Sequence, residues 1–295
     1  MLISRRGMML GLGLVGLAGT STAAYATAIE PFGLVVTRYR PSAPGWPATI
    51  PLRIVVIADL HAGGPNVKHE RVRQVVDTAN GLGGDLTLLL GDYVADHRYV
   101  TERVPHEVWG GELARLSAPL GVWAILGNHD WWRDVHGIRG ALRAAGIPVL
   151  ENDAMRIGRN GKRFWLAGLG DQLAIKIAPH RYRGVDDLSL TMRKVRTDEP
   201  MILMAHEPDI FPRVPERVAL TLAGHTHGGQ IRLPMIGPIY RSGRHGARYS
   251  YGHIVEQDRH MIVSGGIGTS IVPMRLGVPP EIVVVELGSV DDAGA

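Results

Sequence analysis

The side chains best suited to chemistry are histidines and carboxylates that directly follow apolar runs of the sequence. They stand at five places along the chain, together with one asparagine: Asp59, His61, Asp92, Asn128, His206, His225 and His227. Imidazole nitrogens combined with carboxylate and amide oxygens bind borderline divalent cations such as manganese, iron and zinc. Because the chain contains no cysteine, thiolate metal sites, disulfides and cysteine nucleophiles are excluded. These residue types therefore predict a metal site held by His, Asp and Asn.

The spacing of the candidate ligands predicts that some of them share a pocket. Asp59 and His61 are two residues apart, and so are His225 and His227. Alternate side chains of an extended chain lie on the same face, so each pair is expected to point into one pocket. A glycine directly precedes three of the ligand positions, where it allows a tight turn at the end of a strand.

Each of these residues also has an ordinary structural explanation when it is taken alone. A single Asp after a strand usually caps a helix, and a single His is more often a surface or core residue than a ligand. The ordered set, repeated after five apolar runs, is what favours a common site.

Alternating apolar runs and helical periodicities predict the elements that position these residues. Strands are expected at residues 52–58, 86–90, 121–126, 201–205, 218–222, 248–255, 261–264 and 282–286. Helices are expected at residues 67–82, 102–116, 134–145 and 186–195. A hairpin of residues 155–157 and 164–167 is expected to turn at Asn160-Gly161. The pattern predicts an α/β fold of two packed mixed sheets flanked by helices, with ligands gathered at the carboxyl ends of the strands.

The ordered set Asp-x-His, Gly-Asp, Gly-Asn-His-Asp, His and Gly-His-x-His resembles the calcineurin-like metallophosphoesterases, and it extends from Asp59 to His227. The resemblance implies a four-layer α/β/β/α sandwich with two divalent metal ions, manganese, iron or zinc. It also implies which residues bind each ion. One ion would have the ligands Asp59, His61, Asp92 and His227, and the other would have Asp92, Asn128, His206 and His225, so that Asp92 bridges them.

Such a pair of ions would hold a bridging hydroxide that attacks the phosphorus of a phosphoester, so no protein nucleophile is needed. His129, next to the Asn128 ligand, is expected to act as a general acid or to stabilise the transition state, and Asp130 to orient it. A purely structural hydrogen bond is the alternative for His129. Arg275 follows a glycine-rich turn and is the preferred candidate for binding the substrate phosphate, with an ordinary surface arginine as the alternative.

The glycine-rich segments 224–230 and 265–270 resemble the exported or membrane-associated bacterial branch of the family, which includes cell-wall-associated phosphodiesterases and lipid-precursor pyrophosphatases. The expected reaction is hydrolysis of a phosphodiester or pyrophosphate, with a small-molecule, lipid-linked or cell-envelope-linked substrate. A phosphomonoesterase and a non-catalytic metal-binding envelope protein remain alternatives. The formal net charge of +4 is spread along the chain without a basic stripe, which argues against a nucleic-acid partner.

The first residues of the chain predict export. Ser4-Arg5-Arg6 precedes an uncharged stretch over residues 7–28, and Ala26-Thr27-Ala28 matches a small-x-small cleavage pattern. This arrangement is similar to a signal for the twin-arginine export machinery, which implies a periplasmic or membrane-associated protein facing outside the cytoplasm. An uncleaved anchor is the alternative, because an uncharged stretch of this length can cross a bilayer. The expected organisation is a signal or anchor at 1–28, a proline-rich lead-in at 29–50, a metallophosphoesterase domain at 51–288 and a tail at 289–295.

Overall fold

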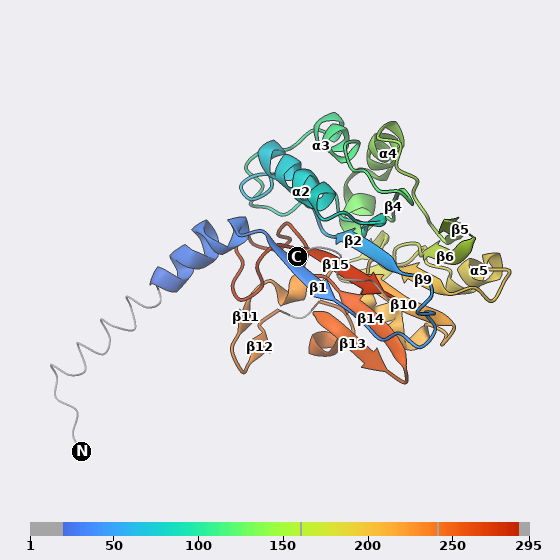
Figure 1. Cartoon of the computed structure of the whole chain (residues 1–295). Helices are drawn as coiled ribbons and strands as arrows, with labels where there is room; N and C mark the ends of the chain where they lie inside the picture. Colours follow the sequence, from blue (N-terminus) through green and yellow to red (C-terminus); the bar gives the residue numbers. More distant parts are fainter. Residues whose placement is uncertain (1–19, 160, 241, 289–295) are drawn as a thin grey trace, which may run out of the picture.

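The computed structural model describes residues 20–159, 161–240 and 242–288 (Figure 1). The paired arginines of the predicted signal, Asn160 of the predicted turn and the predicted tail lie outside the described residues. Residues 20–28 are helical, and this segment leaves the folded domain at its left side in Figure 1. Within the described part of the chain, no helix combines the length and the apolar character needed to cross a membrane.

The first sheet places three candidate ligand loops side by side. Its strands follow one another in the order β1 (Val35–Tyr39), β15 (Glu281–Leu287), β2 (Leu52–Ile57), β3 (Leu86–Leu89) and β4 (Val122–Ala124). Strand β15 is antiparallel to β2, whereas β2, β3 and β4 are parallel. Parallel neighbours end at the same edge of a sheet, so the loops after β2, β3 and β4 meet there.

The second sheet contributes the other ligand loops. Its order is β13 (Gly252–Glu256), β14 (Arg259–Val263), β10 (Val218–Ala223), β9 (Met201–Met204), β6 (Lys162–Gly168) and β5 (Asp153–Arg159). The four central strands are parallel, and the two outer strands are antiparallel to their neighbours. Two small hairpins complete the β-structure: β7 (Ile175–Ala178) with β8 (Arg181–Arg183), and β11 (Arg232–Leu233) with β12 (Gly237–Pro238).

Helices cover the outer faces of both sheets. Figure 1 shows α2 (His69–Gly81), α3 (His106–Leu113) and α4 (Asn128–Ala144) on the first sheet, and α5 (Leu188–Lys194) lies beside the second. Alternate residues of β2 explain this layering, because Ile54 and Val56 pack between the sheets, whereas Val55 and Ile57 pack beneath the helices. The predicted α/β fold of two packed mixed sheets flanked by helices is confirmed.

Two predicted elements differ from the structure. The predicted strand at 248–255 is wrong in its first half, because Gly246–Tyr249 forms the 3-10 helix η4 and the strand begins only at Gly252. The buried Tyr249 packs against Phe211 there and donates its hydroxyl to Glu256. The fourth helix begins at Asn128 and bends at Asp134, so the predicted helix at 134–145 covers only its second part.

Glu112 joins α2 to α3 through a group of cationic side chains. Its carboxylate accepts hydrogen bonds from His69 and Arg73 on α2 and from Arg115 beyond the end of α3. Burial opposes ionisation, but these partners outweigh it and lower the pKa of Glu112 to about 2 from its ordinary 4.5. Because the folded-state pKa is depressed, the interaction stabilises the fold above pH 4.5 and is lost as the pH falls towards 2.

We expect Glu112→Gln to lower the free energy of unfolding by about 1–2 kcal/mol at neutral pH. The deficit relative to the parent chain should shrink as the pH is lowered from 4.5, since the parent loses the same charge. Urea unfolding at several pH values measures both effects. A deficit that stays constant across this range would show that the charge of Glu112 is not what stabilises the contact.

Candidate metal centre

The seven predicted ligands converge at one edge of the two sheets. Asp59 and His61 follow β2, Asp92 follows β3, and Asn128 follows β4; the remaining three ligands, His206, His225 and His227, follow β9 and β10. Six of the seven are at most slightly exposed, and His225 is half-buried. Groups that are far apart in sequence therefore meet at one largely buried place.

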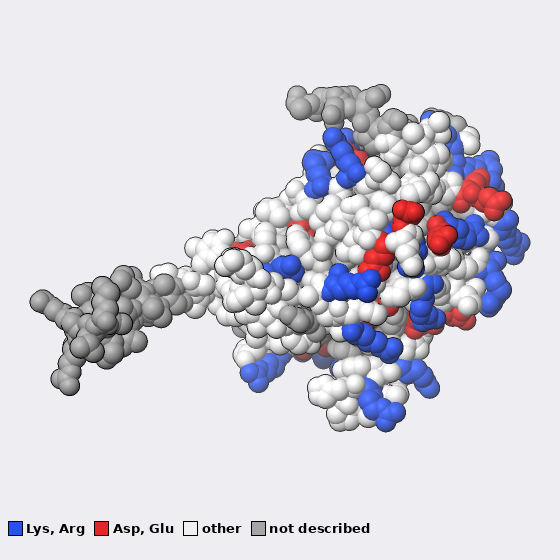
Figure 2. All heavy atoms as spheres, turned by 90° about the horizontal axis from the view of Figure 1, so that it is seen from below, with Lys and Arg blue, Asp and Glu red and all other residues white. Residues whose placement is uncertain are grey.

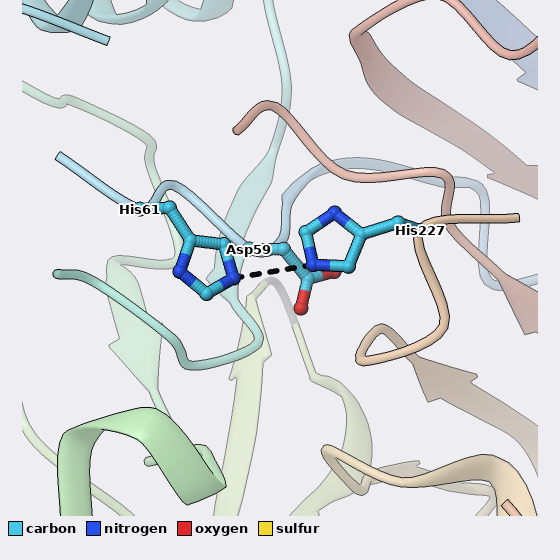
Figure 3. Close-up of side chains that lie close together, drawn as sticks. All are labelled: Asp59, His61 and His227. Atoms are coloured by element: carbon cyan, nitrogen blue, oxygen red, sulfur yellow. Dashed lines mark hydrogen bonds between the residues drawn. The ribbon is translucent and has the colours of Figure 1, made fainter. Parts of the chain in front are cut away.

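One side of the centre is formed by Asp59, His61 and His227, which point towards one another in Figure 3. Their donor atoms all lie within 4.8 Å of one another. Nε2 of His61 is only 3.1 Å from Nε2 of His227. Two imidazole nitrogens facing each other beside a buried carboxylate are an arrangement that a shared cation would stabilise.

The other side is formed by Asn128, His206 and His225. The side-chain oxygen of Asn128 lies 3.2 Å from Nε2 of His206 and 2.9 Å from Nδ1 of His225. An amide oxygen between two imidazole nitrogens adds a second group of donors close to the first.

Asp92 lies between the two groups. Its Oδ2 atom is 3.5 Å from Nε2 of His61 and 3.2 Å from Nε2 of His206. This oxygen is buried and accepts no hydrogen bond from the residues that the structure describes, whereas Oδ1 accepts the backbone N–H of His129. A buried carboxylate oxygen without a partner is costly, so its position favours a cation beside Asp92.

The ring nitrogens that face away from the centre are fixed by the protein. Nδ1 of His61 donates to the carbonyl of Val94, and Nδ1 of His206 donates to the carbonyl of Leu90. These bonds leave Nε2 of each ring directed into the site. Burial also lowers the pKa of His61 and of His225 to about 4, which keeps both rings in the neutral form that binds metals.

The backbone around the ligands is strained. Asp59, His61, Asp92, His225 and His227 all have φ between 43° and 68°, in the left-handed region that non-glycine residues rarely adopt. The expectation that each i, i+2 pair lies on extended backbone is therefore wrong, although the side chains still meet. Such conformations persist where the surrounding structure imposes them, and they cluster at functional sites.

Glycine is needed at two of the strand ends for different reasons. Gly91 has φ of 90°, so it provides the turn that brings Asp92 into the centre. Gly127 has ordinary backbone angles, but a Cβ atom there would lie 2.3 Å from Oδ1 of Asp92 and 2.6 Å from the ring of His206. The close approach of backbone to ligands thus excludes a side chain at Gly127.

His129 is half-buried at the edge of the centre and belongs to a hydrogen-bonded chain of three residues. Its Nδ1 makes a short contact with the carboxylate of Asp96, and its Nε2 lies 3.2 Å from the hydroxyl of Ser270. Burial alone would lower the pKa of His129, but Asp92 and Asp96 outweigh it and raise the pKa. The contact with Asp96 therefore orients the ring and favours its protonated form.

The predicted role of Asp130 in orienting His129 is wrong. Asp130 is fully buried, and its carboxylate accepts the backbone N–H groups of Asp92, Tyr93 and Gly127. It lies in the first turn of α4, so its side chain points back at the loops rather than towards the ring of its neighbour. Asp130 holds the ligand loops together, and Asp96 is the carboxylate that orients His129.

The predicted contact of Arg275 with substrate is also wrong. Arg275 is completely buried, and its guanidinium donates to the carbonyls of Gly265, Gly268 and Val278. It also lies 3.3 Å from Nδ1 of His227, on the side of the ring that faces away from the centre. Arg275 therefore supports the glycine-rich loop and a ligand from behind.

We expect Arg275→Met to lower the free energy of unfolding by about 3 kcal/mol or more, because several buried carbonyls lose their donor. Arg244→Met, at an exposed position, is the matched control and should change stability by less than about 0.5 kcal/mol. Thermal unfolding of both variants measures this difference. A stable Arg275→Met variant that is altered only in its KM would restore the substrate-binding interpretation.

Three residues of the centre were not predicted from the sequence. Asp96 pairs with a histidine 33 positions away, and nothing in its local pattern indicates this. Glu207 places a carboxylate oxygen within 4.8 Å of ring nitrogens of His206 and His225, and its position directly after a predicted ligand was the only signal. The side chain of Gln230 forms hydrogen bonds with the backbone of Ser270 and Val272, so it joins the loop after His227 to the glycine-rich loop.

Comparison with known proteins agrees with this geometry. Residues 52–229 match the calcineurin-like phosphoesterase family. The phosphodiesterase YaeI of Escherichia coli is 32% identical over 249 residues, which cover 80% of this chain and 82% of that protein. The uncharacterized metallophosphoesterase YkuE of Bacillus subtilis is 30% identical, with 97% and 98% of the two chains covered. A transmembrane protein with a metallophosphoesterase domain from Danio rerio is 28% identical, with 80% and 53% covered.

The matched residues include the whole candidate centre, from Asp59 to His227. Both the sequence comparison and the convergence of buried His and Asp donors lead to the same assignment. The chain belongs to the calcineurin-like phosphoesterase family and is a metal-dependent phosphoesterase.

Proposed function

We propose that this chain is a two-metal phosphodiesterase or pyrophosphatase that acts outside the cytoplasm on a lipid-linked or cell-envelope-linked substrate. The observation that carries the two-metal proposal is the position of Asp92, whose unpartnered Oδ2 lies between His61 and His206. A carboxylate shared by two groups of donors is what a pair of cations requires.

In this proposal, one ion would be held by Asp59, His61, Asp92 and His227, and the other by Asp92, Asn128, His206 and His225. The mixture of oxygen and nitrogen donors fits manganese, iron or zinc. When bound, two such ions lower the pKa of water and neutralise the charge that develops on the phosphoryl oxygens.

The chain itself supplies proton transfer and alignment. Asp96 orients the ring of His129 and stabilises its protonated form. Nε2 of His129, the nitrogen opposite that contact, then donates a proton to the oxygen of the leaving group, and Ser270 holds this nitrogen in place before substrate binds. No protein nucleophile is required.

The proposed substrate and location follow from the sequence and from relatives. The twin-arginine pattern around Arg5 and Arg6 and the uncharged stretch after it support export, by cleavage or with the segment retained as an anchor. The name of the Escherichia coli relative specifies a phosphodiesterase, and that of the Danio rerio relative specifies a transmembrane protein. These names support the choice of a diester and of a site near a membrane.

A panel of phosphoesters tests the proposed reaction. The purified chain is supplied with manganese and assayed on soluble phosphomonoesters, phosphodiesters, pyrophosphates and a phospholipid in detergent. We expect faster hydrolysis of diesters or pyrophosphates than of monoesters. A preference for monoesters would replace the proposal with a phosphomonoesterase, and a metal-loaded chain without activity on any substrate would indicate a non-catalytic metal-binding protein. Amino-terminal sequencing of the exported chain tests the signal, because a start at Met1 or Leu2 excludes cleavage.

A further inference from the structure

Large apolar side chains project into solvent from the hairpin of β11 and β12. Met235 is fully exposed, and Ile236, Ile239 and Tyr240 are 68%, 61% and 54% exposed. The segment from Leu233 to Tyr240 contains no charged residue. Soluble domains rarely place so many large apolar groups on one short loop, so this exposure indicates a surface that contacts an apolar phase.

The hairpin adjoins the segment that connects the domain to the start of the chain. Arg232 donates its backbone N–H to the carbonyl of Leu276, and Leu276 donates its own to the carbonyl of Gln230. The residue before Leu276, Arg275, donates its backbone N–H to the carbonyl of Ala26. In Figure 1, β11 and β12 lie directly below the root of the amino-terminal helix. Ile29 and Phe32 in that root are 59% and 46% exposed. Met235, Ile236, Ile239, Tyr240, Ile29 and Phe32 are together called the apolar rim.

The apolar rim is connected through a loop to His129 of the catalytic centre. Gln230, at the base of the hairpin, accepts the backbone N–H of Ser270 and donates to the carbonyl of Val272. Ser270 contacts His129, and Ile271 between these two loop residues is 48% exposed. A surface bound by the apolar rim would therefore lie next to His129.

The charge distribution around the rim fits an anionic surface. The sequence from Arg217 to Val255 contains five arginines and no Asp or Glu. Arg244 is exposed just beyond the hairpin, and Arg248, also exposed, is paired with Glu256. Figure 2 shows that the surface next to the amino-terminal segment is largely uncharged, and that Lys and Arg, with Asp and Glu among them, lie mostly farther away on the same face. An apolar tip bordered by cations is typical of segments that insert into the headgroup region of a bilayer.

We propose that the apolar rim docks on the surface of an anionic phospholipid bilayer, with the hairpin tip inserted at the interface. The uncharged stretch of residues 7–28 favours a bilayer over a protein partner, because its last residues lead into the domain beside this same face. Docking would present the centre to phosphoesters at the membrane surface. Binding to the bilayer does not depend on the reaction proposed above, so the two can be tested separately.

The absence of cysteine makes a direct test possible, because a single introduced cysteine can be labelled at one site. An environment-sensitive fluorophore is attached to the full chain at Met235→Cys. The matched control is Met155→Cys, an exposed methionine on β5 at the opposite side of the molecule. Vesicles of phosphatidylcholine with phosphatidylglycerol are then added.

We expect the label at position 235, but not the label at position 155, to shift to shorter emission wavelengths and to be quenched by spin-labelled lipid. Because both variants carry the same amino-terminal stretch, mere tethering by residues 7–28 would leave the two labels alike, and that result would overturn the proposal. A shift at position 235 that appears without vesicles and grows with protein concentration would also overturn it, in favour of a second copy of the chain.

A charged substitution tests the energetics of the same contact. Ile236→Asp should weaken vesicle binding about tenfold, because an apolar side chain can no longer be buried in the interface. Met155→Asp, at an exposed position on β5 at the opposite side of the molecule, is the control and should bind as the parent does. Unfolding midpoints of both variants verify that the fold is retained. Equal binding by the two variants would contradict insertion of the hairpin.

Discussion

Replacing Asp92 with asparagine is expected to remove both metal ions and to lower turnover on the order of 10³-fold or more. Asp92 directs Oδ2 between His61 and His206, while Oδ1 holds the backbone of His129. Asparagine has one acceptor oxygen and no charge, so it can satisfy one of these tasks and not both. Metal analysis and initial rates on the same preparation measure the two losses together.

A suitable control for this charge removal is Asp209→Asn. Asp209 is a half-buried carboxylate that accepts a backbone hydrogen bond from Arg244 and is not one of the predicted ligands. This variant should retain its metal content and its rate. If Asp92→Asn instead kept two bound ions and a near-normal rate, the bridging role of Asp92 would be disproved.

His129→Ala is expected to keep both ions but to lower the rate by about 10²–10⁴-fold. The His129 backbone N–H, and not its ring, bonds Asp92, so removal of the ring leaves the ligand in place. What is lost is the proton donor that Asp96 orients. The comparison of metal content with rate separates this outcome from general damage to the site. Unchanged turnover would leave His129 with a structural role only.

A companion substitution separates orientation from proton donation. The carboxylate of Asp96 contributes to the raised pKa of His129, so Asp96→Asn should lower that pKa. The ring of His129 would then lose its proton at a lower pH, and the alkaline limb of the pH–rate profile should move to lower pH. Asp130→Asn should weaken the fold without moving this limb, because Asp130 bonds only backbone N–H groups.

The sequence predicted the sheets well because their central strands are buried on both faces. Runs such as Leu86–Leu89 and Met201–Met204 are continuously apolar. Such a run predicts a buried strand whichever elements pack against it. The ligand positions were predictable for the same reason, since each directly follows such a run. The start of α4 was missed because Asn128 and Asp130 are typical of loops and caps, yet here they occupy the first turn of the helix.

The roles of individual side chains depended on contacts that sequence spacing does not encode. Arg275 follows a glycine-rich turn in the way that a phosphate-binding arginine would, but the loop folds around its guanidinium and buries it. Asp130 is adjacent to His129 in sequence but points to the other side of the helix turn, whereas Asp96 reaches the ring from another loop. Tertiary packing sets the direction and the burial of a side chain, and both determine which carboxylate orients His129.

The most direct test of the account is anomalous diffraction from crystals of the chain grown with manganese. We predict two peaks about 3.5–4 Å apart, on either side of the carboxylate of Asp92, one near His61 and His227 and the other near Asn128 and His206. A single peak, or peaks remote from Asp92 in a correctly folded chain, would contradict the claim that five strand ends jointly hold a pair of cations.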